Sequence, residues 1–464
     1  MTKILCGLET EYGLYVEGRG AENQIEDATT LVRSYPGERR VLWDYRFESS
    51  RQDMRGYSVG QLSIDPEDAK FDAGRTYGSD AEVRSDRILA NGARLYNDHG
   101  HPEYATPECW SLDELVKQDL AGQAAVLRAA KAMPGAKLYK NNTDFHGATY
   151  GTHESYLVPR SLPFENLVEA VLPVLLARQL LCGAGKVGSE SGAKCDFQLS
   201  QRADFMTEVL SVDTLYRRPI FNTRDEPHAD ASWWRRLHVI SGDANMNPVS
   251  TKIKVGLIKI AVALALAGQF PKWNFADPIR AIKEVSRDPE APIALSGRSW
   301  TTAEHILRSY LEGTSILEDP ELAEIAAMGN HLLDQRQNDF SGFAGSVDWA
   351  AKRMMLEQFG PDLGSMQAYD LEYHNVDPDE GLYFAVNPRG ETPDGSVLDQ
   401  PPTEGTRARA RALALEFDAL TSASWGHLTF GSETIAIDPT ADYSALQSGM
   451  KLPDFKAALK GLSL

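Results

Sequence analysis

The stretch Asn91–Glu108, NGARLYNDHGHPEYATPE, constrains the fold and function of this chain more than any other. Its part over 94–104 contains two carboxylates, two imidazoles, a guanidinium and two phenols, on Asp98, Glu103, His99, His101, Arg94, Tyr96 and Tyr104. Tyr96 and Asp98 are two positions apart on a predicted strand, so their side chains leave the same face. Pro102 restricts the backbone directly before Glu103 and thereby holds that carboxylate in place. A polar strand–turn–strand with a solvated tip is the alternative, but the density of titratable groups favours a functional site.

A predicted strand near the N-terminus, within residues 3–13, places Glu9 and Glu11 on one face. Two like charges side by side on a sheet repel each other. They persist most easily when a cation lies between them. A solvated edge strand remains the alternative interpretation of these two residues.

Two imidazoles and two guanidinium groups elsewhere in the chain are candidates for the same site. His153 lies in a polar segment over 138–157, and His238 lies between apolar neighbours on a predicted strand. A lone histidine of the second kind is usually a packed core residue, and it becomes a metal candidate only if other ligands converge on it. Arg202 and Arg224 each follow polar neighbours, and arginine forks suit phosphate oxygens. A surface ion pair is the alternative for both arginines.

These candidates lie on or beside predicted strands, so one sheet could bring them together. The result would be an oxygen-rich site with imidazole ligands, which suits Mg²⁺ or Mn²⁺ better than Zn²⁺. Arg94, Arg202 and Arg224 would balance nucleotide phosphates. A carboxylate left uncoordinated could act as a base or a nucleophile. The residues therefore predict a nucleotide-dependent enzyme that acts on a carboxylate or an amide.

Charge and cysteine content exclude several other classes. The formal net charge of −19 over 464 residues argues against broad binding of nucleic acid or anionic membranes. The four cysteines form no CxxC pair, which argues against a structural zinc site. No secretory signal is recognisable, so we expect reduced thiols and a cytoplasmic protein. The two most apolar runs, Leu167–Leu181 and Val255–Gly268, are shorter than a bilayer span and predict buried helices.

Other helices are predicted from their capping patterns. Ser111 would cap a helix over 111–133, and a capping box of Thr301 and Glu304 would begin a helix over 301–312. A further helix is predicted over 347–359.

The chain is predicted to form a large catalytic domain, 1–390, followed by a small C-terminal domain, 391–464. The boundary lies in the segment 387–404, which is dense in Pro, Gly and Asp. Residues 17–90 are predicted to be polar and irregular, with a mobile insertion over about 40–88.

Seven segments of the chain together resemble the Pup ligase/depupylase family: GLETEYG, NGARLYNDHGHPEYATPE, YKNNTDFHGATYGTHESYL, SQRADF, NTRDEPHAD, RRLHVISGDAN and DLEYHNVDPDEGLY. The resemblance runs from residue 3 to about 435. That family looks like a branch of the glutamine synthetase-type carboxylate–amine ligases. The fold it implies is α+β: a curved antiparallel sheet cradle packed by helices, with a small C-terminal domain.

The resemblance also implies roles for individual residues. It makes Asp98 the catalytic carboxylate. It implies a set of metal ligands: Glu9, Tyr96, Glu103, His153 and His238. It implies a set of cofactor-binding residues: Gly7, Glu11, Arg94, Ala105, Thr106, Ser155, Arg202, Arg224, Ile240 and Trp425. Trp425 would stack on adenine, and family members often carry Asn where this chain has Ser155.

The family has two arms, and two features favour the hydrolytic arm. One arm ligates Pup, a small ubiquitin-like modifier, to lysines; the other deamidates the C-terminal glutamine of Pup and cleaves Pup from conjugates. The DHGHPEY segment has one residue fewer between its Asp and HPE than the ligases show. The WDYRFESSRQDMRG segment resembles a loop that the ligases lack.

The resemblance therefore implies hydrolysis of an isopeptide or amide bond, with Mg²⁺ and ATP, or ADP with phosphate, bound as cofactor. Asp98 would attack directly, or it would activate phosphate or water. Pup is acidic, so we expect a local basic groove, and we expect a monomer. The alternatives are a Pup–protein ligase, a small-molecule carboxylate–amine ligase and a non-catalytic Pup-binding module.

Overall fold

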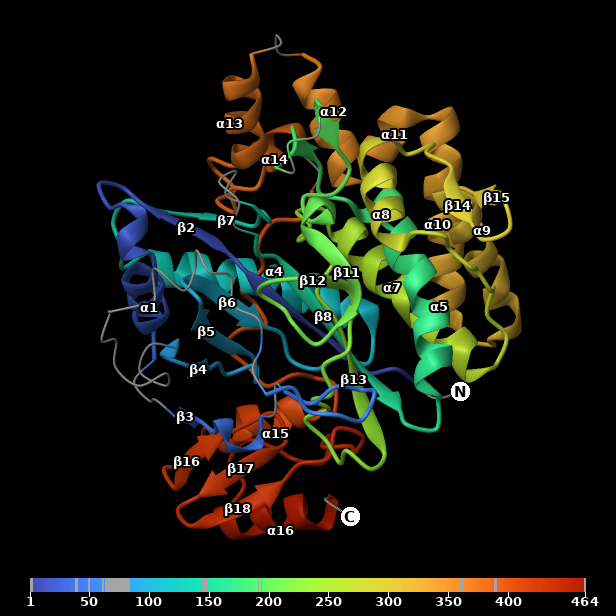
Figure 1. Cartoon of the computed structure of the whole chain (residues 1–464). Helices are drawn as coiled ribbons and strands as arrows, with labels where there is room; N and C mark the ends of the chain where they lie inside the picture. Colours follow the sequence, from blue (N-terminus) through green and yellow to red (C-terminus); the bar gives the residue numbers. More distant parts are fainter. Residues whose placement is uncertain are drawn as a thin grey trace.

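A six-stranded antiparallel sheet forms the centre of the molecule, in the order β13-β8-β1-β6-β5-β4 (Figure 1). Its strands are β1 (Cys6–Glu11), β4 (Arg87–Ile88), β5 (Arg94–Asp98), β6 (His101–Ala105), β8 (Thr152–Pro159) and β13 (Trp234–Val239). The structure is a computed structural model that describes residues 3–37, 41–48, 51–60, 62, 84–143, 149–190, 192, 194–358, 362–387 and 390–462. The α+β class expected from the sequence is confirmed.

Strand register brings distant polar residues together in the middle of the sheet. Glu9 on β1 lies opposite His153 on β8, and Glu11 lies opposite Glu103 on β6. On the other side of β6, Tyr96 of β5 pairs with the same Glu103. Because side chains alternate along a strand, Glu9 and Glu11 leave the same face, as predicted.

The β5–β6 hairpin closes through two residues, His99 and Gly100, between the paired Asp98 and His101. Both turn residues have positive φ, 48° at His99 and 94° at Gly100. Two consecutive positive φ values define the tight hairpin turn whose twist matches that of the flanking strands. The turn fixes Asp98 at the very end of its strand.

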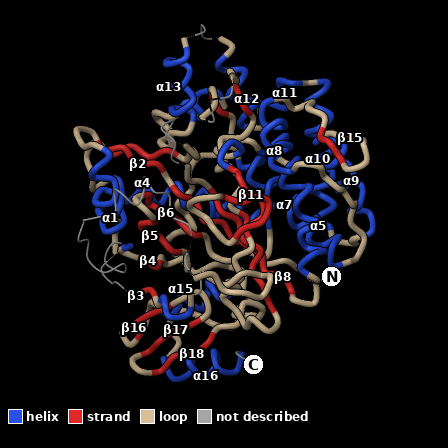
Figure 2. The backbone as a smooth tube through the Cα atoms, in the orientation of Figure 1, coloured by secondary structure: helices blue, strands red, loops and turns tan. Residues whose placement is uncertain are grey.

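Helices cover the sheet and form a layer to one side of it (Figures 1 and 2). Their centre is α7 (Pro248–Leu266), which is buried on almost all sides and contacts α4, α5, α9 and α10. The helices of this part are α1 (Gln24–Ser34), α4 (Leu112–Ala130), α5 (Phe164–Ala177), α6 (Gln179–Cys182), α8 (Pro278–Arg287), α9 (Ala303–Gly313), α10 (Pro320–Asn338), α11 (Phe340–Ala344), α12 (Asp348–Leu356), α13 (Leu363–Tyr373) and α14 (Leu382–Val386). The predicted helices over 111–133 and 255–268 are present as α4 and α7. The predicted helix over 167–181 is divided between α5 and α6, and α12 lies within the described part of 347–359. None of the described helices has both the length and the apolarity that a membrane crossing requires.

Short strand pairs lie outside the central sheet. They pair β2 with β7, β9 with β10, β11 with β12 and β14 with β15. Their bounds are β2 (Gly13–Val16), β7 (Ala136–Tyr139), β9 (Lys186–Val187), β10 (Phe197–Gln198), β11 (Met206–Ser211), β12 (Arg218–Asn222), β14 (Ile293–Leu295) and β15 (Ser299–Thr301).

The C-terminal part has a sheet and a hydrophobic cluster of its own, at the bottom of Figure 1. The sheet order is β18-β17-β16-β3, and two helices accompany it. These elements are β3 (Leu42–Trp43), β16 (Leu420–Ala423), β17 (His427–Phe430), β18 (Glu433–Ala436), α15 (Arg407–Ala414) and α16 (Leu452–Leu462). Val41 packs in the same cluster as Phe430 and Phe455. The start of the 40–88 segment therefore belongs to this sheet, and the domain boundary near 390 stays a prediction.

The prediction of irregular structure over residues 17–90 is wrong in part. α1 lies there, and its residues Ala28, Leu31 and Val32 are fully buried. Much of the predicted insertion, including residues 63–83, lies outside the described residues.

The predicted capping box at Thr301 is also wrong, by one position. Thr301 is the buried last residue of β15, and α9 is capped by Thr302 instead. The hydroxyl of Thr302 accepts a hydrogen bond from the backbone N–H of His305 at 3.2 Å. The S/T-x-x-E spacing misled because the β15–β14 pairing holds Thr301 in a strand.

Replacing Thr302 with alanine is expected to lower the free energy of unfolding by about 1 kcal/mol, because one N-terminal N–H of α9 loses its acceptor. Chemical denaturation of the wild type and of Thr302→Ala would measure the difference. Equal unfolding midpoints would contradict the cap.

Candidate functional site

Glu9, His153 and His238 form a first group of possible metal ligands on neighbouring strands. Oε2 of Glu9 lies 3.8 Å from Nδ1 of His153 and 3.7 Å from Nε2 of His238. These separations are too long for hydrogen bonds, but they suit ligands that share a cation. Within the described part of the chain, neither ring nitrogen of the buried His238 has a hydrogen-bond partner. Burial lowers the pKa of His238 to about 3, so its ring is neutral, the form that binds metals. The group therefore fits a divalent cation.

Glu11, Asp98 and Glu103 form a second group, whose carboxylate oxygens lie within 4.8 Å of one another. Burial and the neighbouring carboxylates raise the pKa of Glu103 well above its usual value. Tyr96 on β5 is paired directly opposite Glu103. Carboxylates this close require a proton or a cation for compensation. His153 connects the two groups, because its Nε2 is 3.8 Å from Oε2 of Glu11.

Asp98 differs from the other carboxylates in having cationic neighbours. Nδ1 of His99 lies 3.0 Å from Oδ2 of Asp98, and Nη2 of Arg84 lies 3.5 Å from Oδ1. Burial alone would raise the pKa of Asp98, but His99 and then Arg84 hold it below its usual value. The same interaction raises the pKa of His99 to about 9. Asp98 is therefore ionised at neutral pH, as a general base or a nucleophile must be.

A cleft adjoins the first group, and Glu9 forms part of its wall. It lies between the central sheet and the C-terminal part, because Trp425 comes from the latter. Five of the predicted cofactor-binding residues line it: Gly7, Ala105, Thr106, Ser155 and Trp425. The other five lie outside its wall: Glu11, Arg94, Arg202, Arg224 and Ile240. Ile240 is buried directly after β13.

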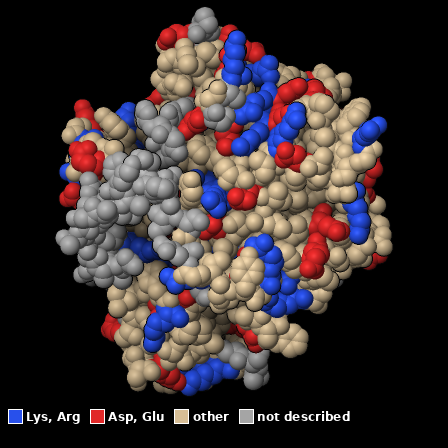
Figure 3. Space-filling model, viewed as in Figure 1, with Lys and Arg blue, Asp and Glu red and all other residues tan. Residues whose placement is uncertain are grey.

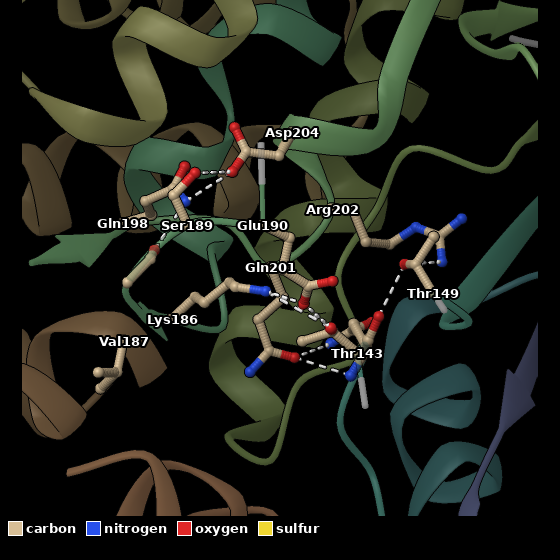
Figure 4. A network of polar contacts seen from close by, with 12 residues as sticks. Thr143, Thr149, Lys186, Val187, Ser189, Glu190, Gln198, Gln201, Arg202 and Asp204 are labelled. Carbon is tan, nitrogen blue, oxygen red and sulfur yellow. Dashed lines mark hydrogen bonds and ion pairs between the residues drawn. The ribbon is translucent and has the colours of Figure 1, made fainter. Parts of the chain in front are cut away.

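Arg202 and Arg224 are predominantly buried guanidinium groups with unused donors. Arg202 donates to the hydroxyl of Thr149 at 3.3 Å, in the polar network of Figure 4. Arg224 donates to the hydroxyl of Thr214 at 3.2 Å. Among the described residues, Nε of neither arginine has a partner. Burial lowers the pKa of Arg202 to about 10, and burial also lowers that of Arg224. Both therefore stay charged at neutral pH and suit an anion.

The surface ion pair considered for Arg224 does not involve its neighbour Asp225. That carboxylate instead accepts two hydrogen bonds from Arg160, at 2.7 and 2.9 Å.

Arg94 is buried, and its guanidinium N–H groups donate to neighbouring side chains. It donates to Asp86 at 2.7 Å and to the hydroxyl of Tyr45 at 2.8 Å. Its guanidinium lies 4.2 Å from the ring centre of Trp43 and 3.9 Å from that of Tyr96. In this arrangement Arg94 joins the start and end of the 40–88 segment to β5.

Arg236, which was not predicted from the sequence, contacts the first metal-ligand group. Its Nη2 lies 2.6 Å from Oε1 of Glu9, and its Nε donates to the hydroxyl of Ser155 at 2.9 Å. Arg236 also lines the cleft. Strand alternation could have found it, because it lies two positions before His238 and shares its face.

The fold and these groups define an α+β protein with two groups of possible metal ligands near a cleft. The chain belongs to the Pup-ligase family, because the family model described as Pup-ligase protein matches residues 4–429.

The chain is similar both to depupylases and to Pup–protein ligases. The chain is 35% identical to a depupylase of Acidothermus cellulolyticus, over 94% of this chain and 93% of the relative. It is 39% identical to a Pup–protein ligase of Gordonia bronchialis, over 70% of this chain and 79% of the relative.

Two solved structures have the same fold. A complex between the prokaryotic ubiquitin-like protein Pup and its ligase PafA matches with a TM-score of 0.77 at 27% identity, covering 100% of this chain and 92% of the other. The Pup ligase PafA in complex with ADP matches with a TM-score of 0.71 at 29% identity, covering 88% and 95%.

Proposed function

We infer that this protein is a depupylase and Pup deamidase. It hydrolyses the isopeptide bond between the C-terminal residue of Pup and a substrate lysine, and it converts a C-terminal glutamine of Pup to glutamate. The observation that carries this inference is the extent of the resemblance to depupylases, which covers 94% of this chain, against 70% for the ligase. The ionised Asp98, beside the acidic groups, supplies a carboxylate for the hydrolytic step.

A nucleotide with Mg²⁺ is the proposed cofactor. Glu9, His153 and His238 would hold one cation, and Glu103 with Tyr96 would contribute from the adjacent strands. The metal, when bound, would polarise phosphate and carbonyl oxygens. Ala105 and Thr106 would contact the nucleotide, and Trp425 would stack on the adenine.

The arginines and Asp98 would act on the reacting groups. Arg202 and Arg224 would bind phosphate or carboxylate oxygens, because their buried guanidinium groups have donors to spare. Asp98 would take a proton from a water that attacks the carbonyl carbon of the terminal side chain of Pup. Alternatively, Asp98 itself, or a phosphate that it deprotonates, would attack this carbon, and water would then hydrolyse the resulting anhydride and restore the carboxylate or phosphate. The leaving group is the lysine amine in a conjugate and ammonia in the deamidation.

The partner is proposed to be Pup, an acidic chain, and pupylated proteins. On the face drawn in Figure 3, basic side chains of the described residues gather in several separate groups between acidic ones. A continuous basic groove is not apparent on that face, so the local basic groove stays a prediction, as do the monomeric state and the cytoplasmic location.

A gel assay with two reactions tests the proposed activity. Purified protein, Mg²⁺ and ATP are mixed with a Pup–protein conjugate in the first, and with Pup ending in glutamate plus the free acceptor protein in the second. We expect free Pup to appear in the first reaction and no conjugate to form in the second.

The second reaction is the direct test of the ligase alternative, which the 39% identity to a Pup–protein ligase keeps relevant. New conjugate there would identify a ligase. No change in either reaction would favour a small-molecule ligase or a protein that only binds Pup.

A further inference from the structure

Glu108 joins the end of the central sheet to the first helix of the C-terminal part. Its carboxylate lies between two arginines of α15: Oε1 is 2.5 Å from Nε of Arg407, and Oε2 is 2.5 Å from Nη2 of Arg411. Arg411 also donates to Oε1 at 3.0 Å, so its guanidinium binds both carboxylate oxygens. The two arginines are buried, and the Glu108 side chain is 11% exposed. The helix α15 therefore directs these two charges inward, not into solvent.

This ion pair is in its charged form at neutral pH. Burial alone would raise the pKa of Glu108, but Arg411 and Arg407 lower it to about 2. Removing one partner of a buried ion pair destabilises the folded protein, because the remaining charge stays buried and unpaired. The geometry of Arg411 is therefore tied to Glu108.

Arg411 holds Trp425 in two ways. It donates to the backbone carbonyl of Trp425 at 3.1 Å, and its guanidinium lies 5.0 Å from the centre of the indole ring. Trp43 packs edge-on against the same ring at 5.0 Å between centroids. Both Glu108 and Trp425 line the cleft, so this contact reaches the wall at which the nucleotide is proposed to bind.

The main chain of α15 also approaches the sheet closely. A Cβ added to Gly92, in the turn between β4 and β5, would lie 2.2 Å from the carbonyl oxygen of Ala408. Gly92 has a φ of 76°, and because it has no side chain the main chain of α15 can approach it. Its carbonyl accepts a hydrogen bond from Nε of Arg411 at 3.3 Å. Arg411 is thus fixed on the sheet side by backbone as well as by Glu108.

We propose that Glu108 and Arg411 are positioning residues that set the indole of Trp425 at the angle and height needed to stack on an adenine base. Glu108 fixes the guanidinium, and the guanidinium fixes the ring and the backbone of Trp425. This inference rests on the proposed nucleotide-binding role of Trp425. It assigns the pair to recognition of the base and not of the phosphates.

Binding of two ligands that differ only in the nucleoside separates these effects. The dissociation constants of Mg-ATP and of magnesium tripolyphosphate are measured by calorimetry for the wild type, Glu108→Gln and Arg411→Met. We expect each variant to bind Mg-ATP about tenfold more weakly, because stacking on an aromatic side chain contributes at this level. The affinity for tripolyphosphate is expected to stay unchanged. The double variant should be no weaker than either single variant, because the two residues act through one contact.

Arg409→Met is the matched control on the same helix. Arg409 donates to the carbonyls of Pro402 and Leu446, within the C-terminal part, and not to Glu108 or Trp425. It should leave both affinities unchanged. If Arg411→Met does not fold, Glu108→Gln, which keeps the shape of the side chain, decides the question alone.

The same binding measurements on Trp425→Ala distinguish an error in the positioning role from an error in the proposed nucleotide site. A wild type that binds ATP and tripolyphosphate equally well would overturn both proposals. If Trp425→Ala loses the preference for ATP while Glu108→Gln and Arg411→Met keep it, only the positioning role is wrong. Equal weakening of both ligands in the two variants would also overturn it, since that is the result of a general structural role.

Discussion

Replacing Asp98 with asparagine is expected to reduce cleavage of a Pup conjugate by about 10³-fold or more, within the range that a general base contributes. Asparagine keeps the size of the side chain but has no ionised oxygen to attack a carbonyl or accept a proton. The effect should be large because His99 and Arg84 keep Asp98 ionised despite its burial. Initial rates in the conjugate assay at saturating nucleotide would measure it.

Asp98→Asn should still bind Mg-ATP and the conjugate, because the first metal-ligand group and the cleft wall do not include Asp98. Asp113→Asn is the matched control: it makes the same chemical change at an exposed position on α4. It should retain wild-type activity. Cleavage retained in Asp98→Asn would remove Asp98 from the mechanism.

Strand alternation made much of the candidate site predictable from the sequence. Glu9 and Glu11 share a face because they are two apart, and Tyr96 and Asp98 do so for the same reason. His153 and Glu154, as neighbours on β8, point opposite ways. His153 faces Glu9, whereas Glu154 binds Arg178 at 2.6 Å in the core. A period of two therefore separates site residues from structural ones wherever a strand is recognised.

Convergence between strands required the structure. The sequence leaves His238 as a core histidine or a ligand, and the choice depends on which strand pairs with β8. The register that places His238 opposite Ser155 brings it to Glu9 across two strands. The pairing of His238 with Ser155 joins residues 83 positions apart, that of Glu9 with His153 joins residues 144 positions apart, and no local pattern encodes either.

Contacts between the central sheet and the C-terminal part could not be predicted from the sequence for the same reason. Glu108 and Arg411 are 303 positions apart, and each has an ordinary local context.

The helix α1 was not predicted for a different reason. Its sequence QIEDATTLVRS is polar, and only its packing against α4 and β5 shows which face is buried. Tertiary contacts outweigh weak local propensity in such helices.

Replacing Glu9 with alanine is expected to weaken Mg-ATP binding on the order of a hundredfold. Residues that only support metal ligands typically contribute 10–100-fold to metal affinity, and a direct ligand contributes no less. Glu9 lies beside both imidazoles of the first group and forms an ion pair with Arg236, and the variant loses all three interactions. Calorimetric titration of ATP with Mg²⁺, and again with EDTA, would measure the affinity and its dependence on the metal.

The dependence on Mg²⁺ distinguishes a ligand from a residue that only shapes the cleft. If Glu9 binds the cation, the wild type should bind ATP much more tightly with Mg²⁺ than with EDTA, and Glu9→Ala should lose most of that difference. Glu165→Ala, at the first turn of α5, is a control that removes a carboxylate away from the cleft. An unchanged affinity in Glu9→Ala would show that the assignment of Glu9 is wrong. A loss that is equal with Mg²⁺ and with EDTA would instead assign the effect to the cleft wall, where Glu9 and Arg236 form an ion pair.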